Sequence, residues 1–313
     1  MIAKTDRAPI DTATARRRLL VIANPTAGVK GRTTVARVAS ELARCGTIVE
    51  IAETVAPADV ERAIAAAGSV DAVVAAGGDG TIRALATAAA ARGLPLGILP
   101  IGTGNVMARE IGLGFSPEAI AATLARGPAI DIEGARANGS PFFLMAGVGF
   151  DAEIVARLST PLKRVAGRAA YAVPTLQVLA MPLACLQVDV DGRMHEAAWV
   201  VVTRVRRYGG AFIIARDAGL ARRTMTAVLF KPASRVALIR QMLALASGRI
   251  EGTSGVEHIY CERVSVRSSA GAAIELDGDT FGRTPLEVIG GGPRLQLIVP
   301  RDYAEASARD TAT

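Results

Sequence analysis

One short stretch of the chain combines residue types that can hold phosphate groups. The apolar run DAVVAA leads directly into Gly77, Gly78, Asp79, Gly80 and Thr81, and an alanine-rich, helix-like pattern follows. Glycines adopt positive φ easily and let the backbone approach a ligand closely, so a strand-to-helix turn of this kind can direct N–H groups at an anion. An ordinary tight turn with a solvated aspartate is the alternative, because short glycine motifs also occur without a ligand.

Three further loops in the same half of the chain follow apolar runs. LLVIA precedes NPTAG (residues 24–28), TIVEIAE precedes Thr54, and GILPI precedes GTGN (residues 102–105). Ligands of open α/β sheets bind beyond the carboxyl ends of the parallel strands, so we expect these loops to converge with the glycine-aspartate turn. None has the spacing of a Walker A loop or of G-x-G-x-x-G, which leaves an unusual nucleotide site as the prediction.

The elements that position these loops change character near the middle of the chain. From Arg18 to about Asp131, apolar runs alternate with helical stretches, which predicts an α/β nucleotide-binding domain with a parallel sheet. From Ala135 onward, short strands predict a β-rich, sandwich-like domain with helical segments near residues 161–179 and 234–247. The predicted domains are residues 16–131 and 132–299. The first fifteen residues and the tail after Tyr303 are expected to fray, with packing of segment 300–313 on the first domain as the alternative.

Other features of the sequence bear on membrane insertion and cysteine chemistry. Residues 169–188 carry no charge and are long enough to span a bilayer, but two prolines interrupt them and the second half alternates like a strand, so a helix followed by a strand is preferred. The run LLVIA is too short for the core of a signal peptide. Cys45, Cys185 and Cys261 show no metal-ligand spacing and are interpreted as small core residues in a reducing compartment.

The loops NPTAG, GGDGT and GTGN, in this order and spacing, resemble the catalytic domain shared by diacylglycerol kinases, sphingosine kinases and soluble bacterial lipid kinases. GVGFD (147–151), LKRVAGRAAY (162–171), the pair Gly209-Gly210 and the DGD motif (277–279) resemble the bacterial lipid kinases, so the resemblance covers roughly residues 18–301. It implies an α/β nucleotide domain and a β-rich lipid domain, with ATP and Mg²⁺ in the cleft between them. It also implies transfer of the γ-phosphoryl group to a lipid hydroxyl, such as that of a diacylglycerol or sphingoid-type acceptor.

The same resemblance assigns roles to individual residues. Backbone N–H groups and threonine hydroxyls of the loops can hold phosphate oxygens, and Asp79 is the predicted ligand of the Mg²⁺ that bridges them. The predicted nucleotide-binding residues are Asn24, Pro25, Thr26, Ala27, Gly28, Thr54, Gly77, Gly78, Asp79, Gly80, Thr81, Ile82, Arg83, Gly102, Thr103, Gly104 and Asn105.

Two positions depart from the family pattern. The C-terminal motif usually reads Asp-Gly-Glu, with the glutamate as proposed general base, whereas Asp279 stands there with a side chain one methylene shorter. Asp79 and Asp279 are the predicted catalytic residues, and a solvated turn aspartate is the alternative for Asp279. Ala218 aligns with the aspartate of a peripheral magnesium site in bacterial members, and Asp217 is displaced from it by one position.

The distribution of charged residues along the chain indicates which binding partners to expect. Residues 157–249 contain fifteen Lys or Arg and four Asp or Glu, while the whole chain carries a net charge of +7. No nucleic-acid motif or aromatic platform appears, so an anionic membrane surface is preferred over nucleic acid, with a generally basic, solvated surface as the alternative. The prediction is a cytoplasmic lipid kinase, peripherally associated with the inner face of the membrane, with a homodimer left open. An NAD kinase and a nucleotide-binding regulatory protein without turnover are the rival functions.

Overall fold

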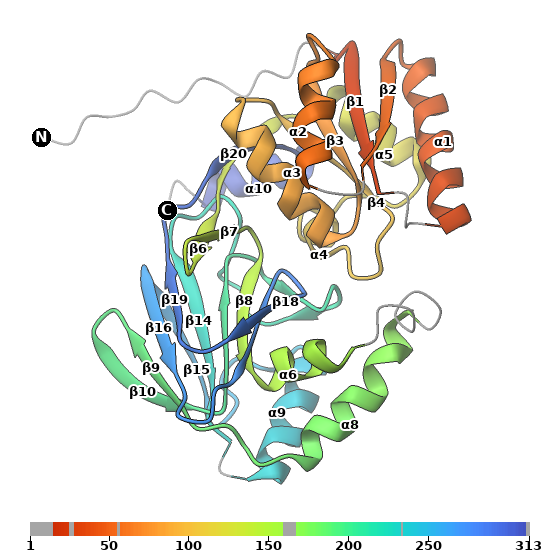
Figure 1. The fold of residues 1–313 in the computed structure, drawn as a ribbon. Coiled ribbons are helices and arrows are strands. Elements are labelled where there is room, and N and C mark those ends of the chain that lie inside the picture. The colour runs from red at the N-terminus through yellow and green to blue at the C-terminus, as the bar shows by residue number, and fades with distance from the viewer. Residues whose placement is uncertain (1–14, 25–27, 55–56, 159–166, 233, 311–313) are drawn as a thin grey trace, which may run out of the picture.

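The computed structural model describes residues 15–24, 28–54, 57–158, 167–232 and 234–310 of the 313-residue chain. Figure 1 shows two domains, an α/β domain formed mainly by the N-terminal half and a β-rich domain formed mainly by the C-terminal half. The predicted fold class is confirmed.

The first domain is built on a six-stranded sheet. Five neighbouring strands are parallel, and the strand at one edge is antiparallel to its neighbour. The order across the sheet is β2 (Ile48–Glu53), β1 (Arg18–Ala23), β3 (Ala72–Gly77), β4 (Leu96–Pro100), β20 (Arg294–Ile298) and β5 (Ala129–Glu133).

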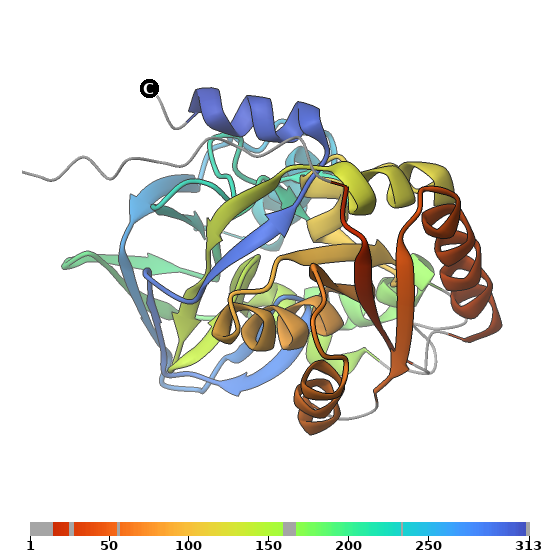
Figure 2. The same cartoon turned by 90° about the horizontal axis from the view of Figure 1, so that it is seen from above.

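Helices cover both faces of this sheet, which explains why its central strands are apolar throughout. Leu19 and Val21 of β1 pack in one core with residues of α1 and α5, while Leu20 and Ile22 pack on the other face with residues of α2 and α3. Figure 2 shows these two helix layers from above. The helices of this domain are α1 (Gly28–Arg44), α2 (Pro57–Ala66), α3 (Asp79–Ala91), α4 (Val106–Glu110) and α5 (Pro117–Arg126).

The C-terminal end of the chain differs from the expectation in two respects. β20, which the predicted boundary at residue 299 assigned to the second domain, pairs with β4 and β5 in the first-domain sheet. The alternating pattern of a short strand predicts a half-buried strand but does not identify its sheet. The tail expected to fray after Tyr303 continues as α10 (Arg301–Asp310), because Tyr303 and Ala304 are buried against the core and anchor the helix. In Figure 2, α10 lies along the outside of the molecule.

The second domain is a sandwich of two six-stranded antiparallel sheets. One sheet has the order β10 (Arg193–Ala197), β9 (Leu186–Val190), β16 (Arg263–Arg267), β19 (Leu286–Ile289), β6 (Ala135–Ala137) and β7 (Ser140–Phe142). The other, here called the β11 sheet, has the order β15 (Val256–Cys261), β14 (Met225–Phe230), β11 (Trp199–Thr203), β8 (Met145–Gly149), β17 (Ala273–Leu276) and β18 (Asp279–Arg283). A short hairpin of β12 (Arg207–Tyr208) and β13 (Phe212–Ile213) forms a separate two-stranded sheet.

The β11 sheet has a second face, which points away from the sandwich core. Val200 and Val202 point into the sandwich core, so Trp199 points to the opposite face. On β17, Leu276 points into the sandwich core, so Glu275 also lies on the face of Trp199.

Three helices lie on the side of this second face (Figure 1): α6 (Phe150–Arg157) packs on β8 and β17, α8 (Ala172–Ala180) packs on α6, and α9 (Arg235–Ala246) packs on β13. The 3₁₀ helix η2 (Gly167–Tyr171) leads into α8. Pro174 lies in the first turn of α8, where a missing N–H breaks no helix hydrogen bond, and β9 follows. Residues 169–188 therefore form helix and strand, as preferred from sequence. No helix within the described residues is long and apolar enough to cross a membrane. Cys185, expected in the core, is exposed in the connection before β9.

Candidate functional site

The loops that follow β3 and β4 meet the second domain at a pocket of about 790 Å³. Backbone from both loops lines one end of the pocket, and residues of β11, α6, α8 and α9 line the other. The two loops touch, because a Cβ added to Gly102 would lie 2.5 Å from the Cα of Gly78. Glycine is therefore required at Gly102 by close backbone contact, and the predicted convergence of these loops is observed.

Asp79 is the first residue of α3, and its carboxylate fastens the two loops together. Oδ2 accepts the N–H of Val106 at 3.0 Å, and Oδ1 accepts the N–H of Met107 at 3.1 Å. The alternative of a tight turn with a solvated aspartate does not describe this residue, because Asp79 receives two otherwise unpaired N–H groups at the start of α4.

Asn105 fixes the shape of the second loop. Its backbone is left-handed, with φ of 48°, and its side chain accepts the N–H of Gly102 at 3.0 Å and donates to the Gly102 carbonyl at 2.7 Å. Asparagine tolerates the left-handed region better than most residues and bonds readily to nearby backbone, which accounts for this choice. Asn105 thus shapes the loop from within.

Asp279 reaches the glycine-aspartate turn from the second domain. A Cβ added to Gly80 would lie 2.7 Å from Asp279 Oδ2, so the carboxylate lies directly against this turn. Arg83 of α3 pairs with the same oxygen at 3.2 Å and donates to the Leu276 carbonyl at 2.9 Å. About half of the Asp279 side chain remains exposed, at 51%. Arg83 therefore bridges the domains and orients Asp279 at the cleft.

Asp277, by contrast, is a structural acceptor. It is buried and accepts the N–H groups of Phe143, Leu144 and Met145, which lead into β8. Burial raises the pKa of Asp277 to about 6, against the opposing effect of these hydrogen bonds. Its left-handed backbone, φ 50°, forms the turn that presents Asp279.

A pair of buried acids lies deeper in the pocket. Asp151 is the last residue of the GVGFD segment and lies in the first turn of α6, and Glu275 precedes the DGD motif on β17. Burial raises the pKa of Asp151 to about 7. Burial, followed by the charge of Asp151, raises the pKa of Glu275 well above its ordinary value. Neither residue was predicted from the sequence to have a role.

The far end of the pocket is apolar. Phe150, Ile154 and Val155 of α6 and Met242 and Leu245 of α9 contribute side chains to this wall. Trp199 of β11 stacks on Phe230 at 3.8 Å between ring centroids and forms the base of the same region. One continuous pocket therefore has a polar, glycine-rich end and an apolar end.

The pocket collects most of the described residues that were predicted to form the site. Its wall includes Asn24, Gly78, Asp79, Gly80, Thr81, Gly102, Thr103, Gly104 and Asp279. Other predicted residues are not among the described residues that line it, namely Thr54, Gly77, Ile82, Arg83 and Asn105. Pro25, Thr26 and Ala27 lie outside the described residues, and Gly28 begins α1.

The reasons for these exceptions differ. Ile82 is 1% exposed and packs in the core, so its side chain cannot contact a nucleotide. Thr54 is buried at the end of β2, with its N–H donating to the Ala23 carbonyl at 3.1 Å. Gly77 accommodates Thr81, since an added Cβ would lie 2.3 Å from the Thr81 hydroxyl oxygen. These residues support the loops without lining the pocket.

The residues present fit a nucleotide with a divalent cation. Glycines at both loops leave backbone N–H groups accessible to phosphate oxygens. Mg²⁺ usually takes one or two carboxylates together with phosphates and waters. Asp79 and Asp279 lie at this end, while the described residues include no cluster of three His, Cys, Asp or Glu side chains that could hold a metal. The site therefore suits a cation that binds mainly through the phosphates.

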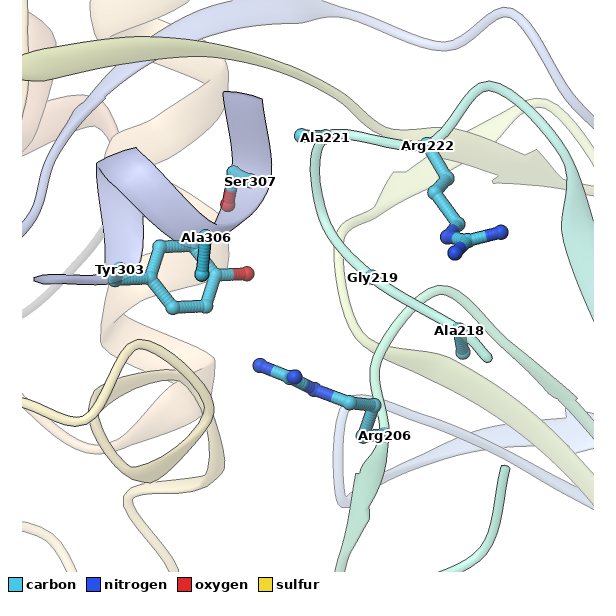
Figure 3. Close-up of a pocket in the computed structure, with 8 residues that line it drawn as sticks. All are labelled: Arg206, Ala218, Gly219, Ala221, Arg222, Tyr303, Ala306 and Ser307. Atoms are coloured by element: carbon cyan, nitrogen blue, oxygen red, sulfur yellow. The ribbon is translucent and has the colours of Figure 1, made fainter. Parts of the chain in front are cut away.

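A second, small pocket lies between α10 and residues 218–222 (Figure 3). This segment contains Ala218, which aligns with the aspartate of a peripheral magnesium site in the family. Arg206, Arg222 and Tyr303 line the pocket, and Arg206 pairs with the buried Glu110 at 2.9 Å. Asp217 instead accepts the Tyr260 O–H at 3.0 Å. Arginine-rich lining does not suit a divalent cation.

Known proteins show the same two parts in the same order. Residues 18–137 match the family model described as the diacylglycerol kinase catalytic domain, and residues 145–301 match that of the YegS C-terminal NAD kinase beta sandwich-like domain. The chain is 27% identical over 298 residues to a protein named diacylglycerol kinase from Bacillus subtilis strain 168, covering 92% of this chain and 98% of that protein. It is 30% identical over 244 residues to one named "Probable lipid kinase YegS-like" from Pseudomonas fluorescens strain Pf-5, covering 74% and 78%.

Two further comparisons concern length and fold. An uncharacterized protein of Synechocystis sp. is 29% identical over 238 residues, a match that covers 73% of this chain and about half, 54%, of that longer protein. The crystal structure of a diacylglycerol kinase from Bacillus anthracis strain Sterne has the same fold, with a TM-score of 0.70 at 21% identity, covering 92% of this chain and 98% of that one. Both family models are matched in chain order by the two domains that enclose the pocket, and the chain therefore belongs to the diacylglycerol kinase catalytic-domain family, in a form that carries a C-terminal β-sandwich.

Proposed function

We propose that the protein is an ATP-dependent lipid kinase that transfers the γ-phosphoryl group to a lipid hydroxyl, with a diacylglycerol or sphingoid-type acceptor. The observation that carries this proposal is the single pocket that joins the glycine loops and Asp279 to an apolar wall. A phosphate-binding end and an apolar end in one cavity suit a substrate with a polar head and a hydrocarbon tail.

In the proposed reaction, the loops hold the nucleotide and Asp279 removes the acceptor proton. Backbone N–H groups of the two glycine loops, other than the Gly102 N–H that bonds to Asn105, donate to phosphate oxygens. Mg²⁺ bound with the nucleotide would neutralise the charge of the phosphates. As the lipid hydroxyl oxygen attacks the γ-phosphorus, its proton passes to the Asp279 carboxylate and ADP leaves. The contact with Arg83 keeps that carboxylate turned toward the loop that carries Gly80.

Phosphorylation of a soluble dinucleotide is the alternative, because the second domain matches a family model described as NAD kinase beta sandwich-like. The apolar wall favours the lipid. The test is to incubate the purified protein with γ-labelled ATP, Mg²⁺ and either NAD or mixed micelles of diacylglycerol or sphingosine. We expect label in the lipid extract. Label in the dinucleotide supports the alternative, and nucleotide binding without transfer supports a regulatory protein.

We also propose that α8 and α9 face an anionic membrane. Val173 and Leu176 of α8 and Val236, Ile239 and Leu243 of α9 are exposed apolar side chains, with exposures from 43% for Ile239 to 76% for Val236. The three on α9 recur at intervals of three and four residues, so they share one face of the helix. A soluble surface seldom gathers apolar residues in this way without a partner.

The pocket and the basic residues support a lipid surface as that partner. Opposite sides of the same helices line the pocket, through Thr175 on α8 and Met242 on α9. A lipid could therefore pass from a bilayer into the pocket between or beside these helices. Arg235 and Arg240 are exposed on α9, and Arg235 also donates to the Ala180 carbonyl at the end of α8, at 3.0 Å. Anionic headgroups would attract such side chains, which places the enzyme at the inner face of the membrane in this proposal.

A further inference from the structure

Two carboxyl groups face each other on the inner wall of the main pocket. Asp151 and Glu275 are each 3% exposed. A Cβ added to Gly147 of β8 would lie 2.4 Å from Asp151 Oδ2 and 2.7 Å from Glu275 Oε1, so both side chains approach the same point. Register explains the meeting, because Gly147 is paired with Glu275 across β8 and β17. Glycine leaves the room that both acids occupy.

The two carboxyl groups accept only a few hydrogen bonds. Asp151 Oδ1 accepts the N–H of Ala152 at 2.7 Å, and its Oδ2 accepts the Tyr208 O–H at 3.4 Å. Glu275 Oε2 accepts the N–H of Gly278 at 2.7 Å. Among the described residues, no Lys or Arg forms an ion pair with either acid. Buried acids of this kind need donors to balance them.

Trp199 supplies an independent observation that indicates a ligand. Its ring is fixed by the stack on Phe230 and by tilted contacts with Phe150 and Tyr208. The residue is 2% exposed, and its indole N–H faces Asp151, yet this N–H makes no hydrogen bond of ordinary geometry within the described part of the chain. A buried polar group without a partner is rare in native proteins and often marks a position completed by another molecule.

We propose that Asp151, Glu275, Tyr208 and Trp199 form a subsite that binds a second, unphosphorylated hydroxyl group of the lipid acceptor. This inference rests on the proposed function, because it defines the acceptor class of the same pocket: it favours an acceptor with two hydroxyl groups, such as a sphingoid base, over a diacylglycerol, which has one. The subsite adjoins both Asp279 and the apolar wall, because Glu275 accepts the N–H of Gly278, the neighbour of Asp279, and Asp151 follows Phe150 of the wall. The headgroup of a lipid would lie there if its tail occupied the wall.

A hydroxyl group matches both sides of the subsite. Its oxygen can accept a well-aligned hydrogen bond from the Trp199 N–H, which faces Asp151 without forming one, and its proton is donated to the Asp151 carboxyl. A protonated amine can donate to the acids but has no lone pair for Trp199. An ester carbonyl can accept from Trp199 but has no proton for Asp151. The hydroxyl is the one of these groups that completes both contacts.

The test compares single-chain acceptors that differ in the groups near the reacting hydroxyl. Mixed micelles present monooleoylglycerol, which has two free hydroxyl groups, oleyl alcohol, which has one, or an amino alcohol of equal chain length with one hydroxyl and one amine. Steady-state phosphorylation is measured for the parent and for Asp151→Asn and Trp199→Phe, the second of which removes the N–H and keeps an aromatic ring. The matched control is Glu153→Gln, because Glu153 lies on the same helix but pairs with Arg283 at 3.1 Å and does not line the pocket.

We expect the parent to use monooleoylglycerol with a kcat/KM at least about tenfold above that of the other two acceptors. Both subsite variants should lose most of this advantage, with kcat/KM for oleyl alcohol and KM for ATP changed less than about threefold, and Glu153→Gln should keep it. Equal loss on all acceptors would indicate a merely structural role, and a preference for the amino alcohol would indicate a cation site. Either result overturns the subsite while leaving lipid kinase activity established. If the parent phosphorylates no lipid, the proposed function fails, and the subsite fails with it.

Discussion

Replacing Asp151 by asparagine is expected to stabilise the fold at alkaline pH. The buried carboxyl has a pKa of about 7 instead of its ordinary 3.8, chiefly because burial disfavours the charged form. Below about pH 4 the group is protonated in both the folded and the unfolded chain. Between pH 4 and pH 7 the unfolded chain ionises first, so the free energy of unfolding falls as pH rises.

The magnitude follows from the size of this displacement. One pKa unit corresponds to about 1.4 kcal/mol, so a rise from 3.8 to about 7 amounts to roughly 4 kcal/mol of stability that is absent above pH 7. An asparagine carries its own cost of burial, and we therefore expect a net gain of about 1–3 kcal/mol at pH 8. The new side chain also removes the charge that raises the pKa of Glu275, which acts in the same direction. Tyr208, Asp277 and Asp279, which also act on the pair, are acids or a phenol, and Arg83 pairs with Asp279 instead of with either buried acid.

Urea unfolding followed by circular dichroism at pH 4 and pH 8 measures this effect. Asp151→Asn should raise the unfolding midpoint at pH 8 and lower it at pH 4, where the Asp151 carboxyl is already largely neutral and only the cost of burying the amide remains. Glu153→Gln, which removes pairs with Arg157 and Arg283, should give no gain at either pH. A lower midpoint for Asp151→Asn at pH 8, or an equal gain at both pH values, would refute the assignment of a buried acid whose charge is costly.

Three further predictions concern catalysis and membrane binding. Asp279→Asn should lower lipid-dependent turnover by about 10²- to 10⁴-fold with ATP affinity preserved, whereas Asp279→Glu should keep substantial activity. Loss of ATP binding in Asp279→Asn, measured by calorimetry, would place Asp279 in the nucleotide site. Asp79→Asn should abolish transfer. It should also lower the free energy of unfolding by about 1–2 kcal/mol, because the amide oxygen replaces only one of the two acceptors. An unchanged unfolding midpoint would contradict the role of Asp79 in holding the two loops together. Sedimentation with vesicles should show binding that requires anionic lipid, weakens with salt and is reduced by Leu243→Glu on α9, whereas equal binding to neutral vesicles would overturn the electrostatic proposal.

The sequence predicted the parts of the fold and site that depend on local pattern. Apolar runs ending in glycine loops located the polar end of the pocket, since the carboxyl ends of parallel strands share one edge. The family resemblance, rather than local pattern, implied a catalytic role for Asp279, whose carboxylate lies against Gly80. The alternation in AIELDGD also contained an unused signal, because residues flanked by Ile274 and Leu276 must face away from the sandwich core.

Long-range contacts could not be predicted in this way. The partners of Asp79 are the N–H groups of Val106 and Met107, whose position depends on how the second loop folds back. Asp151 meets Glu275 only through the packing of α6 against β17. The sequence of β20 was assigned to the sandwich, although the strand pairs with β4 and β5 of the first domain. Its apolar alternation indicates that the strand is partly buried but does not identify the strands next to it.

The central claim, that one pocket joins nucleotide and lipid for phosphoryl transfer, is tested most directly by the stoichiometry of the reaction. ADP and lipid phosphate are measured together in one sample of purified protein with ATP, Mg²⁺ and acceptor micelles. We predict equal molar amounts of the two products and no ADP above background when the lipid is omitted. ADP formed without lipid phosphate, or accompanied by a phosphorylated dinucleotide when NAD is supplied, would contradict the account.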